Sequence, residues 1–196
     1  WFDDNGMGTT EALDLVRDWP EGTWKAILGP WKHSGNAEYD LHGIPMGEDA
    51  LRYDIDLICM MWLEHFLKGV ENGIEKNPKV LYYTLGENRW KTAETWPPQC
   101  VKIQRMDLHS EKNSYVYDPD CPATHIIDMS ENELEVPEDY TEEEKREDYL
   151  VYSTEVLKEP VTVTGDLQVH LFVSCDCPDT DFVFRLLDVD ENGKSV

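Results

Sequence analysis

A histidine and an acid near the start of the sequence are spaced so that they can work as a proton relay. His33 stands in "GPWKHSG", directly after the short apolar run Trp24–Leu28. Asp3 follows two aromatic residues and comes thirty residues before the histidine. One helix and one strand fit into this interval, so two neighbouring strand ends can bring the carboxylate to the imidazole Nδ1. A carboxylate in that place fixes the tautomer of the imidazole and stabilises its protonated form.

Spacing alone leaves two interpretations of this pair open. A histidine after a strand and an acid some distance before it also arise by chance, and most loop histidines simply lie in solvent. Trp31, two residues before His33, is open in the same way. Its indole can line a substrate pocket or pack beneath the histidine loop, and we favour packing.

The first half of the chain alternates helical and strand patterns. Apolar residues at helical spacing predict a helix within residues 9–19, which Pro20 and Gly22 end. A buried strand is expected at Trp24–Leu28. A long helix is expected from Leu51 to Lys68, with acidic residues at its start and Gly69 at its end. Another strand is expected at residues 80–85.

The second half of the chain is predicted to be nearly all β. Turn-forming Asp, Pro, Gly and Asn residues separate six expected strands at residues 101–108, 114–117, 149–152, 161–163, 167–173 and 182–189. The acid-rich segment 131–148 is expected to be a solvated excursion between strands. Because the two halves differ in class, we expect two domains, residues 1–98 and 99–196, with the boundary at Pro97-Pro98.

Composition excludes some partners and leaves others open. The chain has 196 residues, 40% of them hydrophobic, which is enough for a core. A formal net charge of −24 argues against nucleic acid or an anionic membrane as partner, because phosphate groups repel such a surface. No stretch reaches the ~20 apolar residues of a membrane span, and no signal peptide is evident. Five scattered cysteines fit a reduced, cytoplasmic compartment, and a homo-oligomer is compatible with the composition.

Two acidic groups resemble metal sites but are better explained as turns. Residues 188–193 follow the first half of a calcium loop, D-x-D-x-N-G, yet Asn192-Gly193 after a strand is also a hairpin signal. Asp176, Asp179 and Asp181 form a group of three carboxylates that could bind a cation; the family resemblance given below implies instead that residues 179–182 form a structural loop leading into a strand. The remaining five histidines have no ligand-like spacing. We therefore predict no metal and no cofactor.

Several motifs in register resemble the CocE/NonD hydrolases, the group of cocaine esterases, α-amino acid ester hydrolases, glutaryl-7-aminocephalosporanic acid acylases and X-prolyl dipeptidyl peptidases. The opening segment is similar to their W-[YF]-D-x4-G-T-x-E-A pattern, and "GPWKHSG" is similar to G-P-W-x-H. "WLEHFLKG", "GENRW" and "WPP" follow in the same order, and "YDP", "EDYLVYSTEVL" and "DTDFVFRLLDVDENGK" resemble the start of a jelly-roll. The resemblance runs nearly end to end.

This resemblance implies a fold and a mechanism. The fold class is α/β followed by all-β: the C-terminal part of an α/β-hydrolase domain, then the first part of a jelly-roll β-sandwich. Asp3 becomes the acid and His33 the base of a Ser-His-Asp triad that acts on a small-molecule ester or amide. Of the seven serines only Ser195 has a glycine two places before it, and its context is a turn. The nucleophile and the oxyanion donors are therefore expected upstream, in a longer enzyme of which this chain is an internal piece.

Two other classes of function stay open. A jelly-roll without a nucleophile can be a non-catalytic binding module for carbohydrate or protein, although this leaves the acid and the histidine in triad order unexplained. A purely structural oligomerisation domain explains none of the motifs.

Overall fold

The computed structural model describes residues 8–31, 40–41, 44–122 and 139–196. These residues belong to two compact units, one made of the described residues up to Gln99 and the other of residues 100–122 and 139–196. Compactness does not test whether each unit folds independently, so the domain boundary at residue 98 stays a prediction. In the described part of the chain, no helix is long and apolar enough to cross a bilayer.

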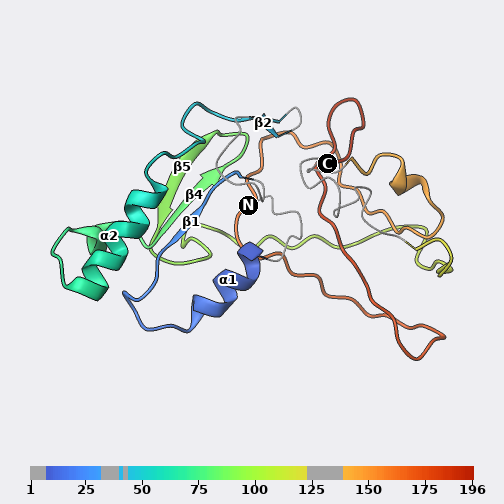
Figure 1. The fold of residues 1–196 in the computed structure, drawn as a ribbon. Coiled ribbons are helices and arrows are strands. Elements are labelled where there is room, and N and C mark those ends of the chain that lie inside the picture. The colour runs from blue at the N-terminus through green and yellow to red at the C-terminus, as the bar shows by residue number, and fades with distance from the viewer. Residues whose placement is uncertain (1–7, 32–39, 42–43, 123–138) are drawn as a thin grey trace. The chain divides into compact units, whose positions relative to one another are not determined.

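The first unit is built on a mixed sheet of three strands in the order β1-β4-β5 (Figure 1). Strand β1 (Ala26–Leu28) runs parallel to β4 (Val80–Thr84), and β4 pairs with β5 (Arg89–Ala93) in an antiparallel hairpin. The expected strands at Trp24–Leu28 and 80–85 are confirmed. Strand β5 was not expected, because "RWKTA" offers a single large apolar side chain to a strand pattern.

The remaining elements are short, apart from the two α-helices. A separate two-stranded ladder joins β2 (Asp40–Leu41) to β3 (Ile44–Pro45). The described 3-10 helices are η1 (Ile74–Lys76) and η2 (Glu143–Lys145).

One face of the three-stranded sheet carries the core of this unit. Residues two apart on a strand share a face, so Val80 and Tyr82 of β4 point to the same side as Leu28 of β1. The helix α1 (Gly8–Arg17) covers this side. The core consists of Trp24, Leu28, Val80 and Tyr82, with Leu13, Val16, Ala26, Ala93 and Trp96 packed against them. Burying each large apolar side chain is worth roughly 1.5–3 kcal/mol.

The long helix α2 (Ile55–Lys68) ends where the sequence predicts. Gly69 adopts the left-handed conformation at φ 67°, and the N–H groups of Gly69 and Val70 bond to the last turn. The helix begins at Ile55, four residues later than expected. The N–H of Ile58 donates to the carbonyl of Asp54 at the start of the helix, whereas the carbonyl groups of Asp49 and Ala50 accept hydrogen bonds from tryptophan side chains.

The second unit contains no strand among its described residues apart from one bridge between Val189 and Ser195. The six strands expected here are not confirmed, and neither is the jelly-roll. Their alternating pattern fits a half-buried sheet, but a strand also requires a neighbour for its backbone groups. In the absence of that pairing, apolar side chains such as Ile103, Val156 and Phe172 are fully or almost fully exposed.

A polar clasp holds the second unit together: the acid-rich stretch 139–148 and the hairpin 188–196. The N–H of Tyr140 donates to the carbonyl of Ser195 at 2.8 Å, and the N–H of Ser195 donates to Thr141 Oγ1 at 3.0 Å. Tyr140 is only 4% exposed. Within residues 139–148 the expected solvated excursion agrees with exposed residues such as Glu142 and Lys145 but not with Tyr140.

An ion pair closes the acidic stretch. Arg146 donates to both carboxylate oxygens of Asp148, at 2.8 and 2.7 Å, and also to the carbonyl of Cys121 at 2.7 Å. The hydrogen bonds from Arg146 hold the pKa of Asp148 below its ordinary value. A carboxylate whose pKa is depressed by folding stabilises the fold above its unfolded pKa and loses this effect as the pH falls through the folded pKa.

Replacing Asp148 by Asn should lower the stability of the second unit at neutral pH. It should also make that stability depend less on pH in the acid range. In the unmodified chain, protection of the 139–149 backbone against hydrogen exchange should fall as the pH drops below about 4, the ordinary pKa of an aspartate. Exchange of this peptide, corrected for intrinsic rates, is the measurement. The exposed Asp107, changed to Asn, is the control and should leave the profile unaltered. If hydrogen exchange depends on pH in the same way in the Asp148→Asn and Asp107→Asn variants, the stabilising role of the Arg146–Asp148 pair is contradicted.

Candidate active site

The histidine motif leaves the sheet at the carboxyl end of β1. Leu28, the last residue of the strand, is buried, and Pro30 is fully buried in the turn that follows. Trp31 is the last described residue before the histidine. Asp3 and His33 lie outside the described residues, so their predicted contact stays a prediction.

The side chain of Trp31 is held by neighbours from two later segments. Its Nε1–H donates to the carbonyl oxygen of Ala50 at 2.9 Å, and Ala50 itself is completely buried. Its ring lies against the ring of Trp90 on β5, with 5.8 Å between centroids and 54° between planes. These contacts describe how the indole is packed. Whether it also borders substrate stays a prediction.

The Trp31 ring occupies the space that a side chain at position 29 would need, and Gly29 has no side chain. A Cβ atom at position 29 would lie 2.3 Å from the ring, far inside van der Waals contact. The glycine of "GPWKHSG" is thus required by the tryptophan two residues later. The local sequence thus restricts the conformation of residues 29–31.

Trp90 and Tyr83 form the other side of this arrangement. They are directly opposite each other in the β4–β5 register and contact edge to face, with centroids 5.3 Å apart. Trp90 Nε1–H donates to the carbonyl of Asp49 at 2.7 Å. Both residues lie on the face of the sheet opposite to the core, because Tyr82 on β4 points the other way.

The segment 45–54 connects the two indoles, and both ends of it are fixed. The N–H of Gly47 donates to the hydroxyl of Tyr83 at 2.9 Å; burial raises the pKa of this hydroxyl, and the bond from Gly47 partly opposes that rise. Arg52 lies over the Trp90 ring at 5.3 Å and pairs with Asp54, whose pKa its hydrogen bonds lower. We refer to Trp31, Tyr83, Trp90 and the segment 45–54 as the aromatic clamp.

The aromatic clamp contains no histidine, cysteine or serine. Its contacts are made by indoles, a phenol of raised pKa, main-chain groups and the Arg52–Asp54 ion pair, and these contacts hold the segment in place. Sequence reasoning named Trp31 but missed Tyr83 and Trp90. The available signal was "GENRW": a turn between two strands that places the tryptophan opposite Tyr83.

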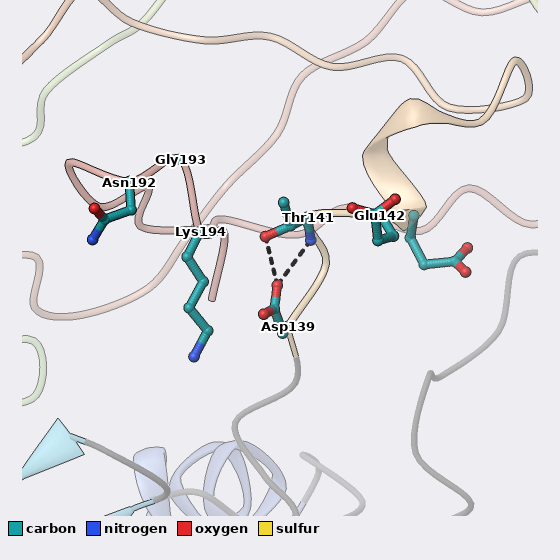
Figure 2. A pocket seen from close by; sticks show the side chains of 7 residues that line it. Asp139, Thr141, Glu142, Asn192, Gly193 and Lys194 are labelled. Atoms are coloured by element: carbon teal, nitrogen blue, oxygen red, sulfur yellow. Dashed lines mark hydrogen bonds between the residues drawn. The ribbon is translucent and has the colours of Figure 1, made fainter.

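A second polar group lies in the second unit. The side chains of Asp139, Thr141, Glu142, Glu143, Asn192 and Lys194, together with Gly193, line an open hollow of about 460 Å³ (Figure 2). Thr141 donates to the carboxylate of Asp139 through both its N–H and its hydroxyl, as the dashed lines in Figure 2 mark. No histidine or cysteine is among the residues that line this hollow.

Ser195, beside this hollow in sequence, has a structural partner. It is 1% exposed, and its hydroxyl donates to Glu144 at 2.8 Å. The described partner of this hydroxyl is a carboxylate and not the imidazole of a Ser-His pair. The expectation that Ser195 lies in a turn region agrees with the hairpin in which it is found.

The calcium-like stretch 188–193 forms a hairpin turn. The carboxylate of Asp190 accepts the N–H groups of Asn192 and Lys194, both at 2.8 Å, and these bonds lower the pKa of Asp190. Asp188 and Val196 exchange two backbone hydrogen bonds across the hairpin. Within the described ranges, no group of three or more His, Cys, Asp or Glu side chains is arranged to hold a metal ion.

Comparison with known proteins agrees with the motifs. Residues 72–196 match the family described as the X-Pro dipeptidyl-peptidase C-terminal non-catalytic domain. Two proteins provisionally named serine esterases, one from Mycobacterium bovis and one from Mycobacterium tuberculosis, are each 31% identical over 187 residues, which cover 86% of this chain and 28% of the relative. The cocaine esterase of a Rhodococcus strain is 28% identical over an alignment that covers all of this chain and 38% of that enzyme. No solved structure gives a significant match.

By these matches, the protein class is that of hydrolases that carry this C-terminal domain. The chain belongs to the X-Pro dipeptidyl-peptidase C-terminal domain family, within the CocE/NonD group that its motifs resemble, so the family prediction is confirmed. The chain spans roughly a third of the length of these curated relatives.

The clamp can be tested through Gly29. We expect Gly29→Ala to destabilise the first unit by about 1–3 kcal/mol, because the new methyl group overlaps the Trp31 ring. In a Trp31→Ala background the same change should cost far less, since the obstructing ring is gone. Urea unfolding of the four proteins of this cycle gives the coupling free energy, and the entropic effect of Gly→Ala cancels within it. Equal costs in both backgrounds contradict the packing.

Proposed function

We propose that this chain supplies the acid, Asp3, and the base, His33, of a Ser-His-Asp triad in a serine hydrolase. The nucleophilic serine then lies in sequence outside residues 1–196. The reaction is hydrolysis of an ester or amide bond in a small molecule. The names of the relatives, serine esterase and cocaine esterase, favour an ester.

The observation that carries this proposal is the place where the histidine motif leaves the sheet. Strand β1 runs parallel to β4, and "GPWKHSG" begins immediately after its last residue. In α/β sheets, ligands and catalytic groups gather beyond the carboxyl ends of parallel strands. Pro30 is buried and Trp31 is hydrogen-bonded to Ala50, so the last two described residues before the histidine are held in place.

The family match supports the same division of labour. The match to a domain described as non-catalytic begins at residue 72. Both candidate triad residues come before that point, and the described residues after it include Ser195, whose hydroxyl is bonded to Glu144. The match therefore favours placing the chemistry in the part of the chain before residue 72.

In this mechanism His33 takes the proton of the serine during attack on the carbonyl carbon and later gives it to the leaving group. Asp3 holds the imidazole in the required tautomer and stabilises the imidazolium. The acidic surface, at a formal net charge of −24, disfavours nucleic acid and anionic membranes as partners.

The isolated 196-residue chain should show no turnover of a nitrophenyl ester above the buffer rate, because none of its seven serines lies in a G-x-S-x-G elbow. Turnover that His33→Ala abolishes would contradict this expectation, since the chain would then hold its own nucleophile.

In the longer protein that contains this chain, His33→Ala should lower kcat/KM for an ester substrate by about 10³-fold or more. Asp3→Asn should lower kcat by a similar order with little change in KM. His109→Ala, a change at an exposed histidine of the second unit, is the matched control and should leave the kinetics unchanged. Full activity of the His33 variant rejects the triad.

A further inference from the structure

We propose that Cys175 and Cys177 form a dithiol site that exchanges with small disulfides and closes into a disulfide of its own. The site lies in the second unit, in the stretch "SCDCPDTD". Its partner is a disulfide of low molecular weight, and a cationic one in preference to an anionic one. The chemistry is separate from the proposed triad, so its test is independent of the proposed function.

The first condition for closure is that the two cysteines come close enough along the chain. Two residues of a fully extended chain span about 6.6–7.2 Å, near or beyond the upper limit of about 6.8 Å between the Cα atoms of a disulfide. A C-x-C pair in a flat strand is therefore too stretched to close. Here the chain bends at residues 176–178, and a bend shortens this span.

The two thiols are also turned toward each other. The thiol of Cys175 donates to the carbonyl oxygen of Cys177 at 3.2 Å, so the first sulfur lies over the second cysteine. A hydrogen bond between the two side chains raises the pKa of Cys177, because it favours the protonated thiol. The bend and these contacts together bring the two sulfur atoms into the same small region.

Both thiols are exposed, so a small disulfide can reach them. Residues 171–180 belong to no helix or strand, and closure of a short ring therefore breaks no regular backbone pairing there. The other three cysteines, Cys59, Cys100 and Cys121, are exposed as well, but each is at least 21 residues from the next cysteine in the sequence. Only the pair at 175 and 177 thus has a second thiol supplied by the adjacent chain.

The exchange takes place in two balanced steps. One cysteine thiolate attacks a sulfur of the small disulfide, forms a mixed disulfide and releases one small thiol. The second cysteine then attacks the protein sulfur of the mixed disulfide and releases the other small thiol. The two cysteines are oxidised, the small disulfide is reduced, and the two thiol protons end on the two products. A disulfide that is exposed and closes so short a ring is readily reduced again.

Acidic neighbours favour a positively charged partner. Asp176 lies between the two cysteines, and Asp179 and Asp181 follow, whereas residues 159–184 contain no Lys or Arg. The charge of Asp176 also contributes to the raised pKa of Cys177. Because like charges repel, cationic cystamine should approach this stretch more readily than anionic glutathione disulfide, and salt should reduce the difference.

The experiment treats the reduced, longer protein that contains this chain with cystamine and maps its tryptic peptides by mass. One peptide, residues 159–185, carries both cysteines and no other, whereas Cys59, Cys100 and Cys121 fall in separate peptides. We expect the peptide 159–185 to become lighter by two hydrogen atoms and to carry no cysteamine. The single cysteines that react should each keep one cysteamine.

Single substitutions separate the two steps. Cys175→Ser and Cys177→Ser should each leave one cysteamine on the peptide 159–185, because the second attack is lost. Cys100→Ser, a change at an exposed single cysteine, is the matched control and should leave closure unaltered. Asp176→Asn should lower the ratio of the closure rates with cystamine and with glutathione disulfide about 2- to 3-fold at low ionic strength. An unchanged ratio overturns the charge preference.

Unfolding tests the contribution of the fold. Closure should be about tenfold more favourable in the folded protein than in urea, because unfolding releases the bend that keeps the two sulfurs close. Equal closure in both states, two cysteamines on the peptide 159–185, or a peptide that stays reduced in the folded protein overturns the proposed site.

Discussion

Two indole N–H groups that donate to consecutive carbonyls are the interaction on which the described first unit depends. Trp90 and Trp31 bond to Asp49 and Ala50, so a strand, a loop after another strand and the approach to α2 meet in one place. An indole combines a large apolar ring with a single donor, which makes it suited to hold an irregular segment whose carbonyls have no helical partner.

The two faces of the three-stranded sheet make different contacts: one packs the hydrophobic core, and the other contacts the segment that follows β1. One face buries Val80 and Tyr82 beneath α1 and provides most of the hydrophobic stabilisation. The other face carries Tyr83 and Trp90 and holds the turn that leads to the candidate base. Because side chains alternate along β4, Tyr82 points to the core face and Tyr83 to the opposite face.

The second unit is held by polar contacts to a greater degree than the first. Its buried residues are few, and the contacts that join residues 139–149 to the hairpin 188–196 are hydrogen bonds and ion pairs around Tyr140, Ser195 and Arg146. Such contacts are specific in direction but contribute about 1 kcal/mol each, and removing one partner of a buried pair costs more than the pair contributes. The acid-rich composition of this stretch therefore reflects a structural role for part of it, and only part of it faces water.

The sequence by itself determined the family, the helix that ends at Gly69, and strands β1 and β4, because these depend on local periodicity, a glycine cap and motifs of fixed spacing. It also placed His33 directly after a strand. It did not reveal β5 or the partnership of Trp31 with Trp90, since "RWKTA" is polar and the two tryptophans are far apart in the chain. Likewise, the alternating segments of the second half indicate which side chains would be buried together but not which strand would pair with which. Tertiary structure decided the aromatic clamp and the burial of Tyr140, because both arise from contacts between distant segments, which no local pattern encodes.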